Sequence, residues 1–191
     1  MTHAGVPQDS PGGAGWVISS APLRWSTRLV VTTSAQTIEA GSVSGTITVQ
    51  RQQQSIFGGS WNGNISDPDL LVTLASSSTA GVFRNTADTA NLTSVTIPFG
   101  QSSASFRYKD TVVGTPVITA GSSGLTSGQQ TETITPFSRI VTTLAESGAG
   151  SLRQALLDQS SIGAAGTIDL SGLSGSIVLQ SPLPLIEQDV T

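Results

Sequence analysis

The segment Ser94–Ala120, SVTIPFGQSSASFRYKDTVVGTPVITA, contains three short runs in which apolar and polar residues alternate. Glycine, proline and serine separate these runs, as they do between consecutive antiparallel strands of a β-sandwich. In the run Ser103–Lys109, the residues Ala104, Phe106 and Tyr108 fall on one face and polar residues occupy the positions between them. A half-buried strand produces this period of two, so the segment predicts an all-β protein.

The same pattern extends outward to cover Leu29–Pro136, and we count about seven strands there. Residues Gln36–Gly41 are expected to form a turn between the first two strands. The predicted strands are Leu29–Thr33, Gly45–Arg51, Leu70–Leu74, Val82–Arg84 (a short strand or a bridge), Ser94–Phe99, Ser103–Lys109, Thr115–Ala120 and Thr131–Thr135. The residues expected to fill the core are Ile47, Val49, Val72, Leu74, Val95, Ile97, Phe106, Tyr108 and Ile118.

The composition limits the classes of function that fit the chain. Of 191 residues only 10% are charged, and the net charge of -4 comes in no block. Nucleic acid is therefore not an expected partner, because the sequence has no basic stripe. Cysteine is absent, which rules out disulfides and thiolate metal sites. The sequence contains no run of about 18 apolar residues, so no transmembrane segment is expected. A surface rich in Ser, Thr and Gly favours an exported bacterial protein, located outside the cell or on its surface.

Residues Ala104–Ala120 carry a further pattern, in which ASF-x-Y-x-D-T is followed by G-x-P-x-ITA. This pattern, with the strands before it, resembles the bacterial immunoglobulin-like (Big-type) repeats of large surface proteins. The resemblance covers residues 29–136 and implies an immunoglobulin-like β-sandwich. Such modules serve as spacers, stalks and binding tips, so the resemblance implies a fold more specifically than a function. The Gln52–Ser66 connection departs from the pattern of these repeats.

Residues 137–191 differ in character from the predicted sandwich. Ser151 followed by Gln154 forms a capping-box pattern, which predicts one short helix over Ser151–Gln159. The runs TIDL, GSIVLQ and DVT then follow at short intervals as candidate strands. The segment SGAGSLRQAL, with the strands after it, resembles the capping region of right-handed parallel β-helix surface proteins. The resemblance implies the start of a β-helix-like segment, whose strands need further coils or another subunit as partners.

Residues 1–28 are predicted to form an N-terminal tail or linker, because they contain prolines and glycines without sustained periodicity. Trp16 and Trp25 are unusual in such a segment. We favour their packing on the neighbouring domain. The alternative is a role in assembly, in which an apolar part of the tail adds to a sheet edge of another subunit.

Asp67 and Asp69 form the best cluster of oxygen ligands in the chain. Calcium binds carboxylate oxygens in loops of this kind, but local hydrogen bonding within a turn is the favoured interpretation. Calcium is therefore the one cofactor that the sequence suggests. Trp61, in a glycine-rich loop, could contact a sugar or a partner, or anchor its loop on the sandwich. Lys109, the single lysine, falls on the polar face of its strand and is expected to be solvated.

These observations leave two classes of function open. The favoured hypothesis is a non-enzymatic structural or adhesive module of a bacterial extracellular surface protein, because no nucleophile–base pair, metal-ligand cluster or phosphate loop is evident. Its expected partners are copies of itself, which would form a fibre by strand or tail exchange, other surface proteins, or surface glycans. The alternative is a fragment of a carbohydrate-binding or carbohydrate-active β-helix protein.

Overall fold

The computed structural model describes residues 26–54, 58–63 and 68–186. Its secondary structure is almost entirely β, with one α-helix near the C-terminal end, which confirms the predicted all-β class. The strands of residues 26–135 are β1 (Ser26–Val31), β2 (Thr37–Glu39), β3 (Ile47–Gln54), β4 (Asn62–Gly63), β5 (Leu70–Ser76), β6 (Val82–Arg84), β7 (Asn91–Leu92), β8 (Ser94–Ile97), β9 (Ser103–Lys109), β10 (Val117–Gly121), β11 (Gly128–Thr131) and β12 (Thr133–Thr135).

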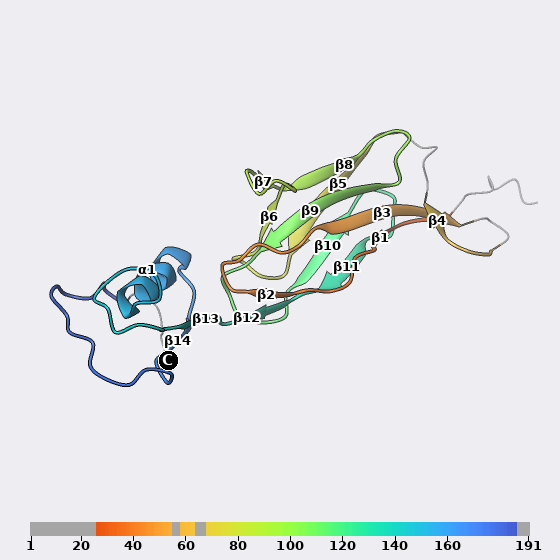
Figure 1. Cartoon of the computed structure of the whole chain (residues 1–191). Coiled ribbons are helices and arrows are strands. Elements are labelled where there is room, and N and C mark those ends of the chain that lie inside the picture. Colours follow the sequence, from red (N-terminus) through yellow and green to blue (C-terminus); the bar gives the residue numbers. More distant parts are fainter. Residues whose placement is uncertain (1–25, 55–57, 64–67, 187–191) are drawn as a thin grey trace, which may run out of the picture.

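Two antiparallel sheets pack face to face to form the sandwich (Figure 1). The first sheet has the strand order β1-β3-β9-β6-β7, and β4 pairs with the far end of β3. The second sheet has the order β11-β10-β5-β8. The described part of these sheets therefore contains ten strands rather than about seven, because short segments such as β4 and β7 add to the expected set.

The core lies between the two sheets and is built by the alternation that the sequence predicted. Phe106 and Tyr108 of β9 are 1% and 0% exposed, and Phe83 of β6 packs edge-on to the Phe106 ring with centroids 5.6 Å apart. Of the nine predicted core residues, eight are buried. Val95 is half-buried, because β8 is an edge strand and its side chains are covered from fewer directions.

A buried polar network accompanies the apolar core at the end of β9. The Tyr108 hydroxyl donates to Asp110 Oδ2 at 2.7 Å, and Ser76 Oγ lies 2.7 Å from the same hydroxyl. Since the phenol has one proton, Ser76 is the donor in the second bond. Burial, followed by the hydrogen bond to Asp110, raises the pKa of Tyr108 well above its ordinary value. Tyr108 therefore acts as a neutral structural donor that ties the two sheets together.

The second and last strands of residues 26–135 pair in a way that the sequence did not predict. The predicted turn at Gln36–Gly41 contains β2, which pairs in parallel with β12. Buried Glu132 supports this pairing, because its Oε2 accepts the Gln36 N–H at 2.5 Å. In addition, β1 begins at Ser26, three residues before the expected start of the domain.

Residues 137–186 form a C-terminal unit beyond one end of the sandwich (Figure 1). Strand β13 (Phe137–Ile140) pairs in parallel with β14 (Gly166–Asp169), and helix α1 (Leu152–Ile162) connects them. The TIDL run therefore includes a strand as predicted, whereas GSIVLQ forms none and DVT lies outside the described residues. No helix in the described ranges has the length and apolar character needed to span a bilayer.

Candidate association surface on the C-terminal unit

Helix α1 is defined at both ends by caps that its sequence provides. Ser151 has an extended backbone, and its Oγ accepts the Gln154 N–H at 3.2 Å, as the capping-box pattern predicted. Gly163 ends the helix in the left-handed region, with a φ of 68°. The helix runs three residues beyond the predicted end at Gln159, and it buries Ala155 and Leu156 against the strand pair.

The parallel strand pair depends on one glycine. Gly166 lies opposite Phe137, and a Cβ atom at Gly166 would stand 2.5 Å from the Phe137 carbonyl oxygen. No side chain fits at that distance, so only glycine allows the two backbones to approach. Helix α1 and the strand pair enclose a small second core of Val141, Ala155, Leu156 and Ile168.

A clasp of two charged residues holds the extended segment that follows β14. Glu146 and Arg153 form a short ion pair, and Glu146 Oε2 accepts the N–H of Gln180 at 3.1 Å. Arg153 donates to the carbonyl oxygens of Ser181 at 2.8 Å and Pro182 at 2.5 Å. These bonds fix residues 180–182 against the start of α1, so SGAGSLRQAL supplies a binding arginine as well as a helix cap.

The clasp is expected to open in acid. Desolvation raises the pKa of Glu146, but hydrogen bonds from Ser181, Gln180 and Arg153, together with the Arg153 charge, outweigh it and hold the pKa below its ordinary value. A group of this kind stabilises the fold above its unfolded pKa, and that contribution is lost as the pH falls through the folded pKa. The NMR shift of the Gln180 amide should therefore titrate with a midpoint below the ordinary glutamate range.

The matched control for this titration is Glu146→Gln, which keeps the shape and removes the ionisable group. The transition at the Gln180 amide should disappear in this variant. Asp169 also has a lowered pKa, through hydrogen bonds from Ser171, so a local probe is needed rather than a global melting curve. A midpoint at or above the ordinary glutamate value would show that the clasp does not stabilise the carboxylate.

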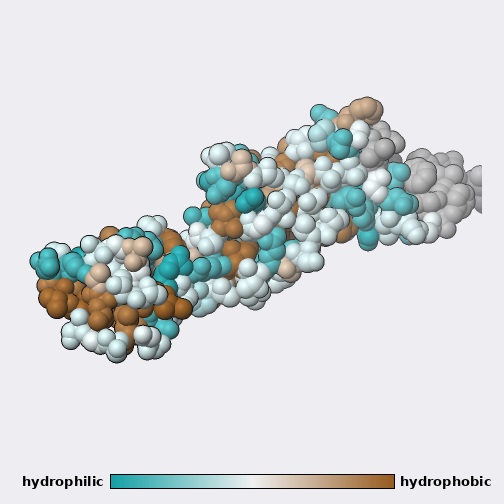
Figure 2. Space-filling view, in the orientation of Figure 1, coloured by the Kyte–Doolittle hydropathy of each residue, from teal (hydrophilic) through white to brown (hydrophobic). Residues whose placement is uncertain are grey.

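Large apolar side chains are concentrated on the surface of the C-terminal unit. Figure 2 shows brown side chains gathered over this unit, whereas the visible face of the sandwich is mostly pale, of intermediate hydropathy, with scattered teal and brown. Seven of the eleven exposed large hydrophobic residues in the described part of the chain belong to the unit, with Val178 and Leu185 72% and 77% exposed. We call this set the apolar rim: Ile140, Leu157, Leu170, Val178, Leu179, Leu185 and Ile186. A patch of this kind is typical of an interaction surface.

Of the two candidate metal ligands, Asp67 and Asp69, the structure describes only Asp69. Asp69 Oδ1 accepts the Phe99 N–H at 2.7 Å, so this carboxylate holds a turn of the sandwich. No group of three or more His, Asp or Glu in the described ranges is placed to hold a metal ion. Asp67 lies outside the described residues, so calcium binding at this loop stays a prediction.

The tryptophans predicted to make contacts are divided between described and undescribed parts of the chain. Trp61 is half-buried, and the guanidinium carbon of Arg28 lies 4.1 Å from the centroid of its ring. This contact anchors the Trp61 loop on β1, as the second interpretation of Trp61 proposed. Trp16 and Trp25 lie outside the described residues, so their predicted role in assembly is unchanged.

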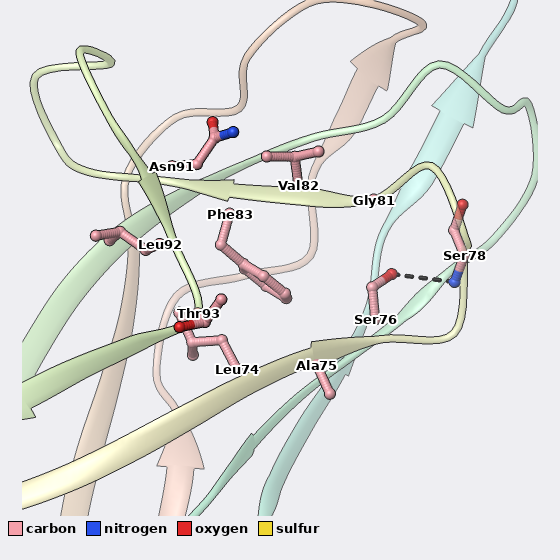
Figure 3. Close-up of a pocket in the computed structure, with 10 residues that line it drawn as sticks. All are labelled: Leu74, Ala75, Ser76, Ser78, Gly81, Val82, Phe83, Asn91, Leu92 and Thr93. Carbon is pink, nitrogen blue, oxygen red and sulfur yellow. Dashed lines mark hydrogen bonds between the residues drawn. The ribbon is translucent and has the colours of Figure 1, made fainter.

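A hollow at the edge of the sandwich has no chemistry suited to catalysis. It encloses about 320 Å³ between β5, β6 and the strand that passes from β7 to β8. Figure 3 shows Phe83 extending from β6 toward β5 into this space, with Leu74 and Leu92 beside it. None of the ten lining residues is titratable, and Ser76 Oγ is engaged by Tyr108 and by the Ser78 N–H. The hollow therefore offers neither a base nor an activated nucleophile.

Comparison with known proteins does not assign the chain to a family. No protein-family model matches the sequence, and no curated protein matches it. Among solved structures, domains 4 and 5 of the S-layer protein SbsC are 15% identical, with a TM-score of 0.38 over 58% of this chain and 53% of that chain. This chain therefore spans about half of that structure.

Two further structures from Bacteroides species show likeness of the same degree. A glycosyl hydrolase family 2 member from Bacteroides cellulosilyticus is 13% identical, with a TM-score of 0.38 over 58% of this chain and 14% of that chain. A conjugative transposon lipoprotein from Bacteroides eggerthii is 8% identical, with a TM-score of 0.32 over 55% of this chain and 92% of that chain. Likeness at this level shows neither a family nor a function for the chain.

Proposed function

We propose that the chain is a non-enzymatic structural module of a bacterial extracellular surface protein, and that its C-terminal unit associates with a second copy of the chain. The observation that carries the proposal is the apolar rim. Val178 and Leu185 project into solvent from a segment that the Glu146–Arg153 clasp holds in place. Association on a prearranged surface costs less ordering entropy than association through a free tail.

The sandwich supports this role because it is a rigid spacer rather than a reaction site. Three of its carboxylates are used within the fold: Asp110 binds Tyr108, Glu132 binds the backbone of Gln36, and Asp69 binds the backbone of Phe99. Low charge and the Ser-, Thr- and Gly-rich composition support a location outside the cell. These are properties of a module that holds its shape and presents a surface.

The experiment is sedimentation velocity of the chain over a wide range of concentration. The wild-type chain should associate, and the double variant Val178→Ser/Leu185→Ser should associate at least tenfold more weakly, because two apolar contacts of about 1 kcal/mol or more each are lost. Both side chains are more than 70% exposed, so the variant should fold as the wild type does. The matched control is Leu71→Ser/Phe99→Ser, which removes side chains that are 58% and 70% exposed on the sandwich.

A wild-type chain that stays monomeric at every concentration would contradict self-association, as would a control that weakens it equally. Monomeric behaviour would favour the second candidate function, a β-helix protein that binds or acts on carbohydrate. The specific observation in favour of that candidate is the parallel pair of β13 and β14, joined through α1 and bordered by the apolar rim. Further parallel coils stacked on this pair would cover the same side chains.

A further inference from the structure

The outer face of the first sheet gathers cations that are far apart in the sequence. Phe83, Phe106 and Tyr108 point into the core, so the residues that alternate with them point outward. Strand register places Arg84 opposite Arg107 and Val82 opposite Lys109 on this face. Arg28 of β1 projects from the same face opposite Gln52. We call the side chains of Arg28, Arg84, Arg107 and Lys109 the basic face; they are four of the eight Lys and Arg residues in the chain.

Carboxylates do not balance the charge of the basic face. Asp88 pairs with Arg84 at 2.6 Å, but neither Arg107 nor Lys109 forms an ion pair with any described residue. Arg107 Nε is buried and has no hydrogen-bond partner among the described residues. Arg84 and Arg107 also lie directly opposite each other, an arrangement that is unfavourable for like charges. A bound anion would relieve this repulsion and pair with the cations that lack a carboxylate partner.

One end of the basic face forms a hollow of about 250 Å³, lined by Val43, Val82, Arg84, Asp88, Asn91 and Lys109. Figure 3 shows that Val82 and Asn91 project away from Phe83, which places them on the outer side of the sheet. The guanidinium of Arg84 is oriented by Asp88 and Asn91, which leaves two of its five N–H donors for other acceptors. The hollow lies below the ~300 Å³ typical of drug-sized ligands, so it suits a single anionic group.

The rest of the face presents oriented amides and one aromatic ring. Gln52 Oε1 accepts two bonds from Arg28, at 3.1 and 2.9 Å, and Gln52 Nε2 donates to Gln50 Oε1 at 2.8 Å. This chain of bonds leaves Gln50 Nε2 as an outward donor. Trp61 lies beside Arg28 at the far end. Val43 pairs with Lys109 at one end of the basic face, and Gln52 pairs with Arg28 at the other end. Val43 and Gln52 are nine residues apart, a span of roughly 30 Å for extended chain.

We propose that the basic face binds an acidic polysaccharide. Carboxylate or sulfate groups of the polymer contact Arg107 and Lys109, and its hydroxyl groups contact the amides that lead toward Trp61. An extended polymer is the ligand that reaches both ends of the face. Nucleic acid fits less well, because it needs a denser row of cations and more aromatic rings for stacking. This binding activity goes beyond the association of the C-terminal unit and does not depend on it.

The test measures binding of three polymers by isothermal titration calorimetry: dextran sulfate, polygalacturonate and neutral dextran. We expect at least one of the two acidic polymers to bind, more weakly as salt is raised, and neutral dextran not to bind. Binding of dextran sulfate alone would identify sulfate as the recognised group, and binding of polygalacturonate alone would identify carboxylate. Equal binding of neutral dextran, or tighter binding of single-stranded poly(dT), would overturn the proposal.

Three variants connect the binding to the basic face. Arg107→Gln/Lys109→Gln should raise the dissociation constant about tenfold, because two charge-assisted contacts at a partly exposed site are lost. The charge-conserving Arg107→Lys/Lys109→Arg should retain most of the affinity. The control Ala75→Glu/Thr131→Glu lowers the net charge by the same two units at exposed positions of the second sheet.

The proposal is wrong if the control weakens binding as much as the glutamine variant, because the effect would then reflect net charge alone. It is also wrong if the glutamine variant binds as tightly as the wild type. Val178→Ser/Leu185→Ser, the variant of the apolar rim, should bind the polymer with unchanged affinity per chain. Polysaccharide binding and self-association can therefore fail separately.

Discussion

Replacing Phe106 with alanine is expected to lower the free energy of unfolding of the chain by about 3–5 kcal/mol, the range for large aromatic residues in a packed core. Phe106 is 1% exposed at the centre of β9, which is itself a central strand of the first sheet. Its ring meets that of Phe83 edge to face, at an interplanar angle of 77°. The substitution removes this contact and leaves a cavity between the two sheets, which the surrounding strands cannot fill.

Urea denaturation followed by circular dichroism measures this loss. The matched control is Phe99→Ala, which removes the same side chain where it is 70% exposed, and it should change stability by no more than about 0.5 kcal/mol. A change of less than about 1 kcal/mol for Phe106→Ala would mean that the space between the sheets collapses around the missing ring. It would also mean that the sandwich is not the unit whose packing determines global stability.

The strands of the sandwich were predictable because each is a local pattern. Alternation in Ser103–Lys109 placed Phe106 and Tyr108 inside, and the structure confirms the strand with the same bounds. A period of two reports which side of a strand is buried, and it needs no knowledge of the neighbouring strand.

Pairing between distant segments was not predictable from such patterns. The parallel pairing of β2 with β12 joins residues about 95 positions apart, and Gln36–Gly41 contains turn-forming residues that conceal the short strand. Buried Glu132 was similarly unrecognisable, because its partners include the Gln36 N–H, which becomes a neighbour only after folding. Sheet order, rather than local propensity, decides these contacts.

The basic face illustrates the same limit for function. No basic stripe is visible in the sequence, because Arg28, Arg84 and Lys109 lie far apart along the chain. The order β1-β3-β9-β6 brings these strands side by side and turns the cations to one face. Lys109 was expected to be solvated on the polar face of its strand, and it lies there, where it also lines a hollow beside Arg84. A search for runs of charge in the sequence can detect a basic helix or tail. It does not detect a basic sheet face, because the cations of such a face come from separate strands.

The C-terminal unit was partly predictable for a different reason. Ser151 and Gln154 encode a helix cap locally, so the start of α1 was found from the sequence. The clasp was not found, because the distant partners of Glu146 and Arg153 are mostly backbone groups about thirty residues away, at positions 180–182. Backbone donors and acceptors carry no sequence signature, and the role of the charged pair therefore became visible only in the structure.

Replacing Phe137 with alanine is expected to destabilise the C-terminal unit by about 3–5 kcal/mol while the sandwich stays folded. Phe137 is fully buried at the junction between β12 and the unit, and its backbone contacts Gly166 at a distance that only glycine allows. The guanidinium carbon of Arg139 lies 4.1 Å from the centroid of its ring. Removing the ring therefore loosens both the parallel strand pair and the residue that links it to Glu39.

Hydrogen exchange distinguishes local from global loss, because amides of α1 and β14 should exchange faster while those of β3 and β9 keep their protection. The matched control is Ile140→Ala on the same strand, where the side chain is 63% exposed and its removal should cost no more than about 0.5 kcal/mol. Equal acceleration in both parts would show that Phe137 belongs to the cooperative core of the sandwich. The unit would then be a continuous extension of the sandwich, and the apolar rim would be presented at the end of one rigid body.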